Sequence, residues 1–252
     1  RDDLTGFVGT HYGPNQMILA AAGAVDHDAL VAQAEKLFGH LPSRPRAGLI
    51  QPAKFVGGER RENKKLEQVH FALAFEGPDY HDPAIYTAQI YASAMGGGMS
   101  SRLFQEIREK RGLCYTIFAQ AGAYEDTGLT TIYAGTSAEE IAELANITMD
   151  EMKRAADDMS AAEVARSRAQ MKAGLLMGLE SPSNRAERLA RLLAIWDRIP
   201  SVAETVESID AVTTSDVRDF AARTAEAGAA LTLYGPSDAA PSLEALRARL
   251  VA

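Results

Sequence analysis

The chain has 252 residues, of which 46% are hydrophobic and 24% are charged, as in an ordinary folded globular protein. Its formal net charge of −8 argues against nucleic acid or a membrane surface as a partner, because phosphate groups bind to a basic face. Apolar runs stay short of the ~20 residues that a membrane span needs, and the single cysteine, Cys114, excludes an internal disulfide and a multi-thiolate metal site.

The first part of the chain is expected to contain two helices and a strand. Asp2 and Asp3 are candidate caps of a short helix that reaches about residue 12. Residues 16–23, QMILAAAG, have the composition of a buried strand, and residues 26–41 have the spacing of an amphipathic helix. The segment LPSRPRAGLIQPA, residues 41–53, contains three prolines and is predicted to be a linker.

The rest of the chain mixes strands and helices. Residues 66–77 alternate in polarity, with Val69, Phe71, Leu73 and Phe75 on one face of a strand. Asp82 is a candidate cap of the next helix, with Pro83 in its first turn. Further elements are expected in this order: a helix over about 100–110, strands over 114–124 and 128–135, helices over 137–158, 160–180 and 183–199, a helix and a strand over 213–238, and a helix over 242–250.

An internal repeat links the two ends of the chain. Residues 2–26 and 215–238 share an acidic and aromatic helix start, an apolar strand and a Gly-x-x-Asp turn. The matched pairs are Asp3 with Asp216, Phe7 with Phe220, and Gly23 with Gly235. Chance similarity is the alternative interpretation. If the repeat is real, we expect residues 1–45 to be the C-terminal tail of a preceding, similar domain and residues 46–252 to be a complete domain.

The residues show no motif for a metal site or a nucleophile. None of the histidines forms His-x-x-Glu-His in either direction, the pattern that brings two imidazoles together for zinc. His70 alternates with Val69 and Phe71, so we expect it to be structural. Cys114 has no histidine near it in sequence, which argues against a catalytic thiol. No metal ligand is therefore predicted within this chain.

The stretch MGGGMSSRLFQEIREKRGLCY, residues 95–115, is the strongest candidate for a site. Gly96, Gly97 and Gly98 lead into a helix whose N-terminal N–H groups suit an anionic or carbonyl-rich ligand. Arg108 and Tyr115 bracket a turn, and such side chains bind carbonyl groups and a developing oxyanion. The residues alone favour a plain turn and a solvated helix, with weak ion pairs such as Glu106 with Lys110. A phosphate-binding loop is a third alternative, but the Lys-Ser/Thr pair that it requires is missing.

The run GGGMSSRLFQEIREKRGLCY, residues 96–115, resembles the C-terminal-half signature of the pitrilysin, insulinase and mitochondrial processing peptidase family of inverted-motif zinc metallopeptidases. Residues 11–42, HYGPNQMILAAAGAVDHDALVAQAEKLFGHLP, are similar to the end of that family's metal-binding half. The resemblance implies an α+β fold, in which a mixed, largely antiparallel sheet packs against helices. It also agrees with the internal repeat, because these enzymes contain two similar halves.

The resemblance also implies roles for particular residues. Arg108 and Tyr115 would position the substrate and stabilise the transition state, as assisting catalytic residues. Gly96, Gly97, Gly98, Met99 and Ser100 would contact an extended peptide or unfolded protein substrate.

The family's zinc ligands lie in its other half, so the resemblance implies zinc in a missing half or in a partner subunit and none in this chain. We therefore expect no peptidase activity from this chain alone. The alternative is a non-catalytic partner subunit or scaffold of a processing-peptidase-like complex, as a homo- or hetero-dimer. The type is expected to be bacterial. One thiol does not determine the compartment; we expect the cytoplasm, with the periplasm as the alternative.

Overall fold

The computed structural model describes residues 1–43 and 51–251, which fall into two compact units. Unit 1 comprises residues 1–52 and 174–201, and unit 2 comprises residues 53–173 and 202–252. The predicted linker lies partly outside the described residues, as does the predicted domain boundary after residue 45. That boundary therefore stays a prediction.

Unit 1 is helical. Its elements are α1 (Asp2–His11), the short 3-10 helix η1 (Pro14–Gln16), α2 (His27–Phe38) and α6 (Pro182–Trp196). Both predicted N-terminal helices are confirmed, but Asp2 and Asp3 lie inside the first turn of α1 and do not cap it. Asp26 does cap α2, because its carboxylate accepts a hydrogen bond from the Ala29 N–H at 2.8 Å.

The strand predicted over residues 16–23 is wrong. The chain is extended at Met17, but no described residue pairs with this segment as a strand. Met17, Ile18 and Leu19 are all exposed. An apolar run indicates that a segment is suited to burial, but a strand forms only where a neighbouring strand supplies its backbone hydrogen bonds.

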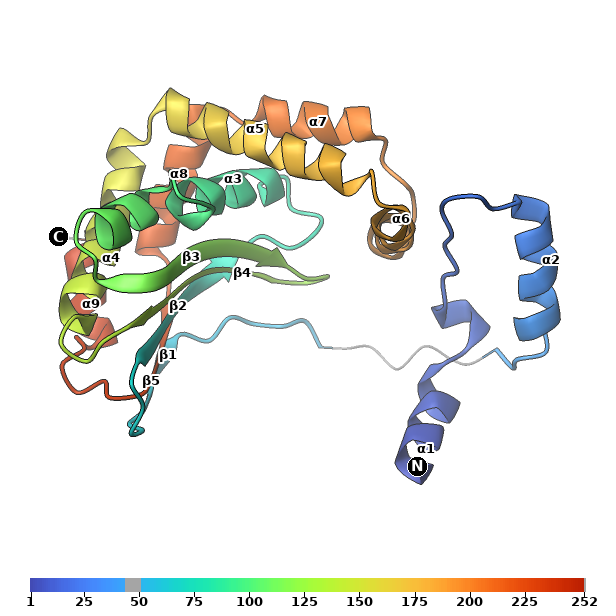
Figure 1. Ribbon diagram of the computed structural model, residues 1–252, viewed down its shortest axis with the longest axis horizontal. Helices are drawn as coiled ribbons and strands as arrows, with labels where there is room; N and C mark the ends of the chain where they lie inside the picture. The colour runs from blue at the N-terminus through green and yellow to red at the C-terminus, as the bar shows by residue number, and fades with distance from the viewer. Residues whose placement is uncertain (44–50, 252) are drawn as a thin grey trace. The chain divides into compact units, whose positions relative to one another are not determined.

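Unit 2 contains a five-stranded sheet in the order β1-β5-β2-β4-β3 (Figure 1). Its strands are β1 (Gly58–Glu62), β2 (Val69–Gly77), β3 (Cys114–Ala123), β4 (Gly128–Thr136) and β5 (Ala229–Tyr234). β1 pairs with β5 in parallel, and the other three pairs are antiparallel. The mixed, largely antiparallel sheet of an α+β fold is therefore confirmed. β1 was not predicted, because its sequence GERRE has no apolar alternation.

Helices cover one face of this sheet, as Figure 1 shows for α3 and α8. The helices of unit 2 are α3 (Ile85–Gly96), α4 (Ile141–Asp158), α7 (Val202–Ala211), α8 (Thr214–Glu226) and α9 (Leu243–Val251), while α5 (Ala161–Gly178) runs from unit 2 into unit 1. α7 was not predicted. α3 begins at Ile85, later than expected, and the Asp82 carboxylate accepts from the Ala84 N–H in the preceding turn.

The core lies between the sheet and these helices. Val69, Phe71, Leu73 and Phe75 are all buried, so the predicted alternation of β2 is confirmed. The strand register continues this buried apolar face onto the neighbouring strands, because Leu73 lies opposite both Ile132 of β4 and Leu231 of β5. Burial of these apolar rows is the main force that holds helices and sheet together.

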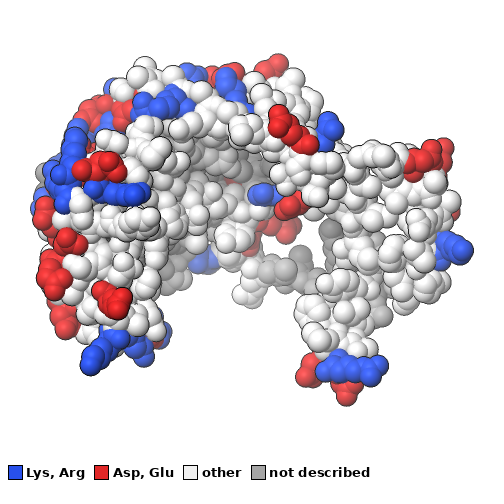
Figure 2. Space-filling view, in the orientation of Figure 1, with Lys and Arg blue, Asp and Glu red and all other residues white. Residues whose placement is uncertain are grey.

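The opposite face of the sheet carries half-buried and exposed aromatic side chains. Its members are His70, Phe118, Tyr133 and Tyr234, which we call the aromatic row. The His70 Nδ1 lies 2.7 Å from the Tyr133 hydroxyl, in agreement with the structural role predicted for this histidine. Among the described residues, no helix is long and apolar enough to cross a membrane. Figure 2 shows acidic and basic side chains interspersed over the helices of unit 2 on the face drawn.

The two copies of the internal repeat have their structural elements in the same order. In each copy a helix is followed by an extended segment, a glycine with positive φ and a second helix. The φ angle is 118° at Gly23 and 122° at Gly235. The copies differ in strand pairing. Residues 229–234 form strand β5 inside the sheet, whereas the described part of the chain contains no strand that pairs with residues 16–23.

Candidate functional site

The predicted helix over residues 100–110 is wound as a π-helix, η2 (Phe104–Glu109). The Gln105 N–H donates to the Ser101 carbonyl four residues back, whereas the Lys110 N–H donates to the Gln105 carbonyl five residues back, both at 3.0 Å. Short π-helical segments are rare and are often found at functional sites. Arg108 lies inside this π-helical segment, in its last turn.

Arg108 lies between two aromatic rings. Its guanidinium carbon is 4.5 Å from the centre of the Phe104 ring and 4.9 Å from the centre of the Tyr115 ring. Contacts of this type hold a cation in place without neutralising it. No carboxylate or carbonyl among the described residues pairs with Arg108, whereas Arg102 and Arg111 of the same region both form ion pairs.

Tyr115 occupies an irregular position at the start of β3. Cys114 lies opposite Thr136 and Thr116 lies opposite Gly135, so Tyr115 is the extra residue of a β-bulge. Bulges redirect side chains and are common beside active sites. The Tyr115 side chain is 78% exposed. The structure thus brings Arg108 and Tyr115 together, with the tyrosine accessible to a ligand.

The turn between Arg108 and Tyr115 depends on Gly112. Its φ angle of +68° lies in the left-handed region that glycine adopts without strain. The Gly112 N–H donates to the Arg108 carbonyl and the Leu113 N–H donates to the Ile107 carbonyl, each at 3.0 Å. These two bonds close the π-helix and direct the chain into β3.

The glycine run divides into a packing part and a surface part. A Cβ atom on Gly96 would lie 2.2 Å from the Ala119 backbone nitrogen, so this glycine lets α3 approach β3 closely. Gly98 has open space around it, with the Gln170 side chain 4.0 Å from the position of a Cβ. Gly97, Met99 and Ser100 are exposed. The peptide contacts expected of residues 96–100 stay a prediction. The close packing of α3 against β3 is by itself enough to require glycine at position 96.

Side-chain bonds hold the loop after the glycines in place. The Ser101 hydroxyl donates to the Gly98 carbonyl at 2.6 Å, and the Gln105 amide donates to the Met99 carbonyl at 2.6 Å. The predicted ion pair between Glu106 and Lys110 is confirmed, and Glu106 also accepts from Arg111 at 2.9 Å. Exposed pairs of this kind contribute little to stability.

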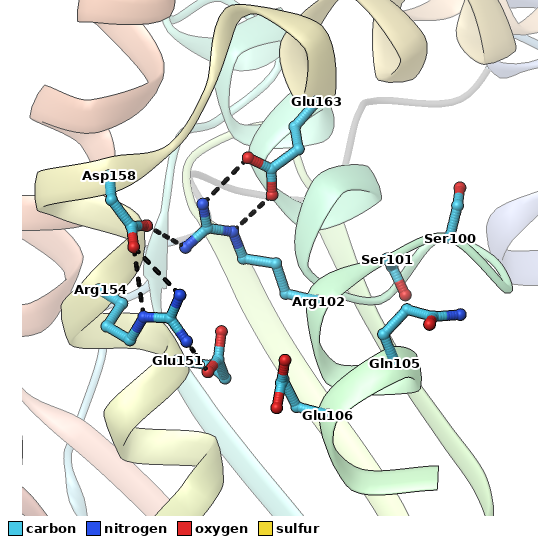
Figure 3. A pocket seen from close by; sticks show the side chains of 9 residues that line it. All are labelled: Ser100, Ser101, Arg102, Gln105, Glu106, Glu151, Arg154, Asp158 and Glu163. Atoms are coloured by element: carbon cyan, nitrogen blue, oxygen red, sulfur yellow. Dashed lines mark hydrogen bonds and ion pairs between the residues drawn. The ribbon is translucent and has the colours of Figure 1, made fainter. Parts of the chain in front are cut away.

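Beside this loop lies a cavity of about 350 Å³ with mixed charge, shown in Figure 3. It is lined by Ser100, Ser101, Arg102, Gln105, Glu106, Glu151, Arg154, Asp158 and Glu163. Arg102 donates to Glu163 at 2.6 Å and to Asp158 at 2.5 Å. The sequence contained no signal for this network, because the two acceptors lie 61 and 56 residues away along the chain.

The network changes the acidity of its members. Burial alone would raise the pKa of Glu163, but hydrogen bonds from Arg102 and Ser160 dominate and lower this pKa to about 2. Burial raises the pKa of Glu151, and the nearby Glu106 carboxylate adds to the effect against the opposing charge of Arg154. The cavity therefore contains a tightly bound ion pair and a carboxyl group that is less acidic than usual.

The remaining candidate chemistry is absent from this region. Cys114 is buried, and burial raises the pKa of its thiol to about 11, so it does not form a thiolate readily. Across residues 1–43 and 51–251, no group of three His, Cys, Asp or Glu side chains is placed to hold a metal ion. The chemistry available at this site is hydrogen-bond donation from Arg108 and Tyr115.

Comparison with known proteins gives consistent matches. Residues 1–171 match the family model described as the peptidase M16 inactive domain. The chain is 36% identical over 239 residues to a protein of Rickettsia bellii named an uncharacterized zinc protease, covering 94% of this chain and 58% of that protein. It is 33% identical over 264 residues to the probable mitochondrial-processing peptidase subunit beta of Arabidopsis thaliana, covering 99% of this chain and 50% of that protein.

The chain thus spans about half the length of these curated relatives. Among solved structures, it is similar to a chain of complex III2 from Candida albicans, with a TM-score of 0.81 and 22% sequence identity. That likeness covers 90% of this chain and 56% of the other, and it shows the same fold.

Proposed function

The chain belongs to the M16 peptidase family, whose inactive-domain model it matches, and we propose that it is the half of a zinc endopeptidase that binds and positions an extended peptide. The observation that carries this proposal is the pair of Arg108 and Tyr115. One offers a guanidinium that has no carboxylate partner among the described residues, the other offers an exposed tyrosine, and they lie side by side where an edge strand begins. Such donors suit a peptide carbonyl whose oxygen becomes negative during hydrolysis.

The metal that the relatives' names imply does not fit the described residues of this chain. Zinc needs three or four ligands from His, Cys, Asp or Glu side chains, and the described residues offer no such group of three. We assign the zinc to the other half of the protein or to a partner subunit. In this proposal Arg108 orients the scissile carbonyl and Tyr115 donates to its oxygen, while Met99 and Ser100 contact the peptide beside them.

A domain assignment belongs to the same proposal. Residues 1–45 would be the tail of a preceding domain and residues 46–252 the complete inactive domain. The repeat supports this assignment, because Gly23 and Gly235 share an uncommon backbone conformation. The exposed apolar segment 16–23 would then be the counterpart of β5, paired with the sheet of the other domain.

A non-catalytic partner subunit is the second candidate function. The observation in its favour is that one curated relative is named as a subunit, the beta subunit of a processing peptidase. The retained pair of Arg108 and Tyr115 favours a chain that assists cleavage over a pure scaffold.

The test combines this chain with a family half that carries the zinc motif. We expect the purified chain to bind no stoichiometric zinc and to leave peptides intact, and the assembly to cleave them in a chelator-sensitive way. Metal analysis and a fluorogenic peptide assay measure both properties. Stoichiometric zinc together with chelator-sensitive cleavage by the chain alone would refute the assignment of the metal to the other half.

A further inference from the structure

The two edges of the sheet in unit 2 are built differently. β1 forms one edge and carries the sequence Glu59-Arg60-Arg61-Glu62, with ion pairs between Arg60 and Glu62 and between Arg61 and Glu59. Charged side chains on an edge strand discourage another chain from adding to the sheet. This edge is therefore protected by its own sequence.

β3 forms the other edge and lacks that protection. Its ten residues, CYTIFAQAGA, include no charged residue and no proline. β4 is its one hydrogen-bonded neighbour among the described strands, so the outer row of β3 backbone N–H and C=O groups has no strand partner there. Tyr115, Thr116, Phe118 and Gln120 are exposed along it. A long, uncharged edge of this kind is a template for an added strand.

Arg108 marks one end of this edge. It contacts Tyr115, the second residue of β3, and no carboxylate among the described residues pairs with it. β3 itself contains no acidic residue, but Glu125 follows it closely, and an antiparallel second copy would bring that carboxylate towards Arg108, so a dimer is the competing outcome of the test below. A peptide with a carboxylate at one end would satisfy both features, pairing its backbone with β3 and its charge with Arg108.

We propose that the free edge of β3 binds the peptide segment on the N-terminal side of the cleaved bond as an added antiparallel strand. This inference rests on the proposed function. An antiparallel strand places its C-terminal end at the start of β3, beside Arg108 and Tyr115. Hydrolysis converts the scissile carbonyl into a carboxylate at that point, so Arg108 binds the new C-terminus of the product. Phe118 of β3 lies beside this strand and packs against Tyr133 of β4, with 5.1 Å between the ring centres.

The first test uses the purified chain and a fluorescein-labelled hexapeptide, Val-Thr-Val-Thr-Val-Ala, with a free C-terminal carboxylate. Fluorescence anisotropy compares it with the C-terminal amide and with two N-methylated forms, modified at residues 2 and 4 or at residues 3 and 5. Alternate N–H groups of an added strand face β3, so only one of the two methylated forms loses the N–H groups that donate to β3. We expect that form to bind at least about tenfold more weakly and the other form to lose little affinity. Equal loss in both forms, or no loss in either, would overturn edge pairing.

The second test concerns Arg108. The free carboxylate is expected to bind about tenfold more tightly than the amide, the gain of one charge-assisted hydrogen bond. Arg108→Gln should remove that preference, and Arg247→Gln, which changes an exposed arginine on α9, should retain it. A preference that survives Arg108→Gln would overturn the role of Arg108.

These outcomes separate the inference from the proposed function. If the assembly cleaves peptides but binding shows no dependence on the methylated register, edge pairing fails and the proposed function stands. If binding shows the register dependence but no assembly cleaves, the proposed function fails. A dimer through β3 that the hexapeptide cannot displace would overturn the inference in favour of a second copy.

Discussion

At the scale of single residues, the site depends on two side chains with different exposures. Arg108 is half-buried between the Phe104 and Tyr115 rings, whereas Tyr115 extends into solvent from a bulge. The guanidinium is thus held in a defined position, and the hydroxyl is accessible. The spacing of the two residues was visible in the sequence, but their contact was not, because it depends on the turn at Gly112.

Tyr115→Phe removes the hydroxyl and leaves the ring against Arg108. In an assembly that cleaves peptides, we expect kcat to fall about 100-fold, as for loss of one oxyanion donor, with little change in KM. Tyr124→Phe, at an exposed tyrosine just after β3, is the control and should leave kcat unchanged. Steady-state kinetics on a fluorogenic peptide measure both variants. An unchanged kcat in Tyr115→Phe would remove this residue from the mechanism.

Glu163 should make the stability of unit 2 depend on pH. Its pKa falls from 4.5 to about 2 on folding, which corresponds to about 3.5 kcal/mol at about 1.4 kcal/mol per pH unit. Because the folded-state pKa is the lower one, this stabilisation is present above pH 4.5 and is lost as the pH falls towards 2. Glu163→Gln should therefore destabilise the chain at pH 7, with a difference that shrinks towards pH 2.

Urea denaturation at pH 7 and pH 3 measures this effect. Glu67→Gln, at an exposed loop position, serves as the control and should change the midpoint little at either pH. A Glu163→Gln difference that is equally large at both pH values would contradict a stabilisation that depends on the charged carboxylate.

At the scale of elements, Gly96 and Gly112 allow α3, η2 and β3 to join closely. Gly96 lets the end of α3 approach the backbone of Ala119, and Gly112 turns the chain into β3. The π-helical winding between them sets the direction of Arg108. Its sequence predicted a helix correctly, but a pattern of polar and apolar residues does not distinguish hydrogen bonds to the fourth and the fifth residue.

Substitution of two glycines distinguishes packing from surface roles. Gly96→Ala would place a Cβ 2.2 Å from the Ala119 nitrogen, and we expect a loss of about 2 kcal/mol in the free energy of unfolding, as for overpacked sites. Gly98→Ala has space around it and should change this free energy by less than about 0.5 kcal/mol. Urea denaturation compares them, and equal effects would contradict the packing role of Gly96.

At the scale of the whole molecule, unit 2 has its own sheet and core, whereas unit 1 exposes apolar side chains on residues 16–23. Unit 1 has the helices of the repeat without a sheet among the described residues. The family assignment and the α+β fold agree with what the sequence indicated. The strand that failed to form, over residues 16–23, is the one that has no partner strand among the described residues.

Hydrogen exchange tests this account of unit 1. In the chain alone, the amides of residues 17–22 should exchange rapidly, because they form no strand. Attachment of the preceding family half should protect them strongly, while β5 amides keep the protection that they already have. Mass spectrometry after deuterium labelling measures both segments. Residues 17–22 that stay unprotected in the joined protein would contradict their pairing with the other domain.

The sequence by itself determined the alternation of β2, most of the helices and the family, because these depend on local periodicity and on a contiguous motif. Tertiary structure decided what depends on distant partners. It paired Arg102 with Asp158 and Glu163, placed charged β1 at one edge and uncharged β3 at the other, and brought Arg108 to Tyr115. The physical reason is that backbone pairing and ion pairs form between residues far apart in the chain, so their geometry exists only after the sheet and its helices have packed.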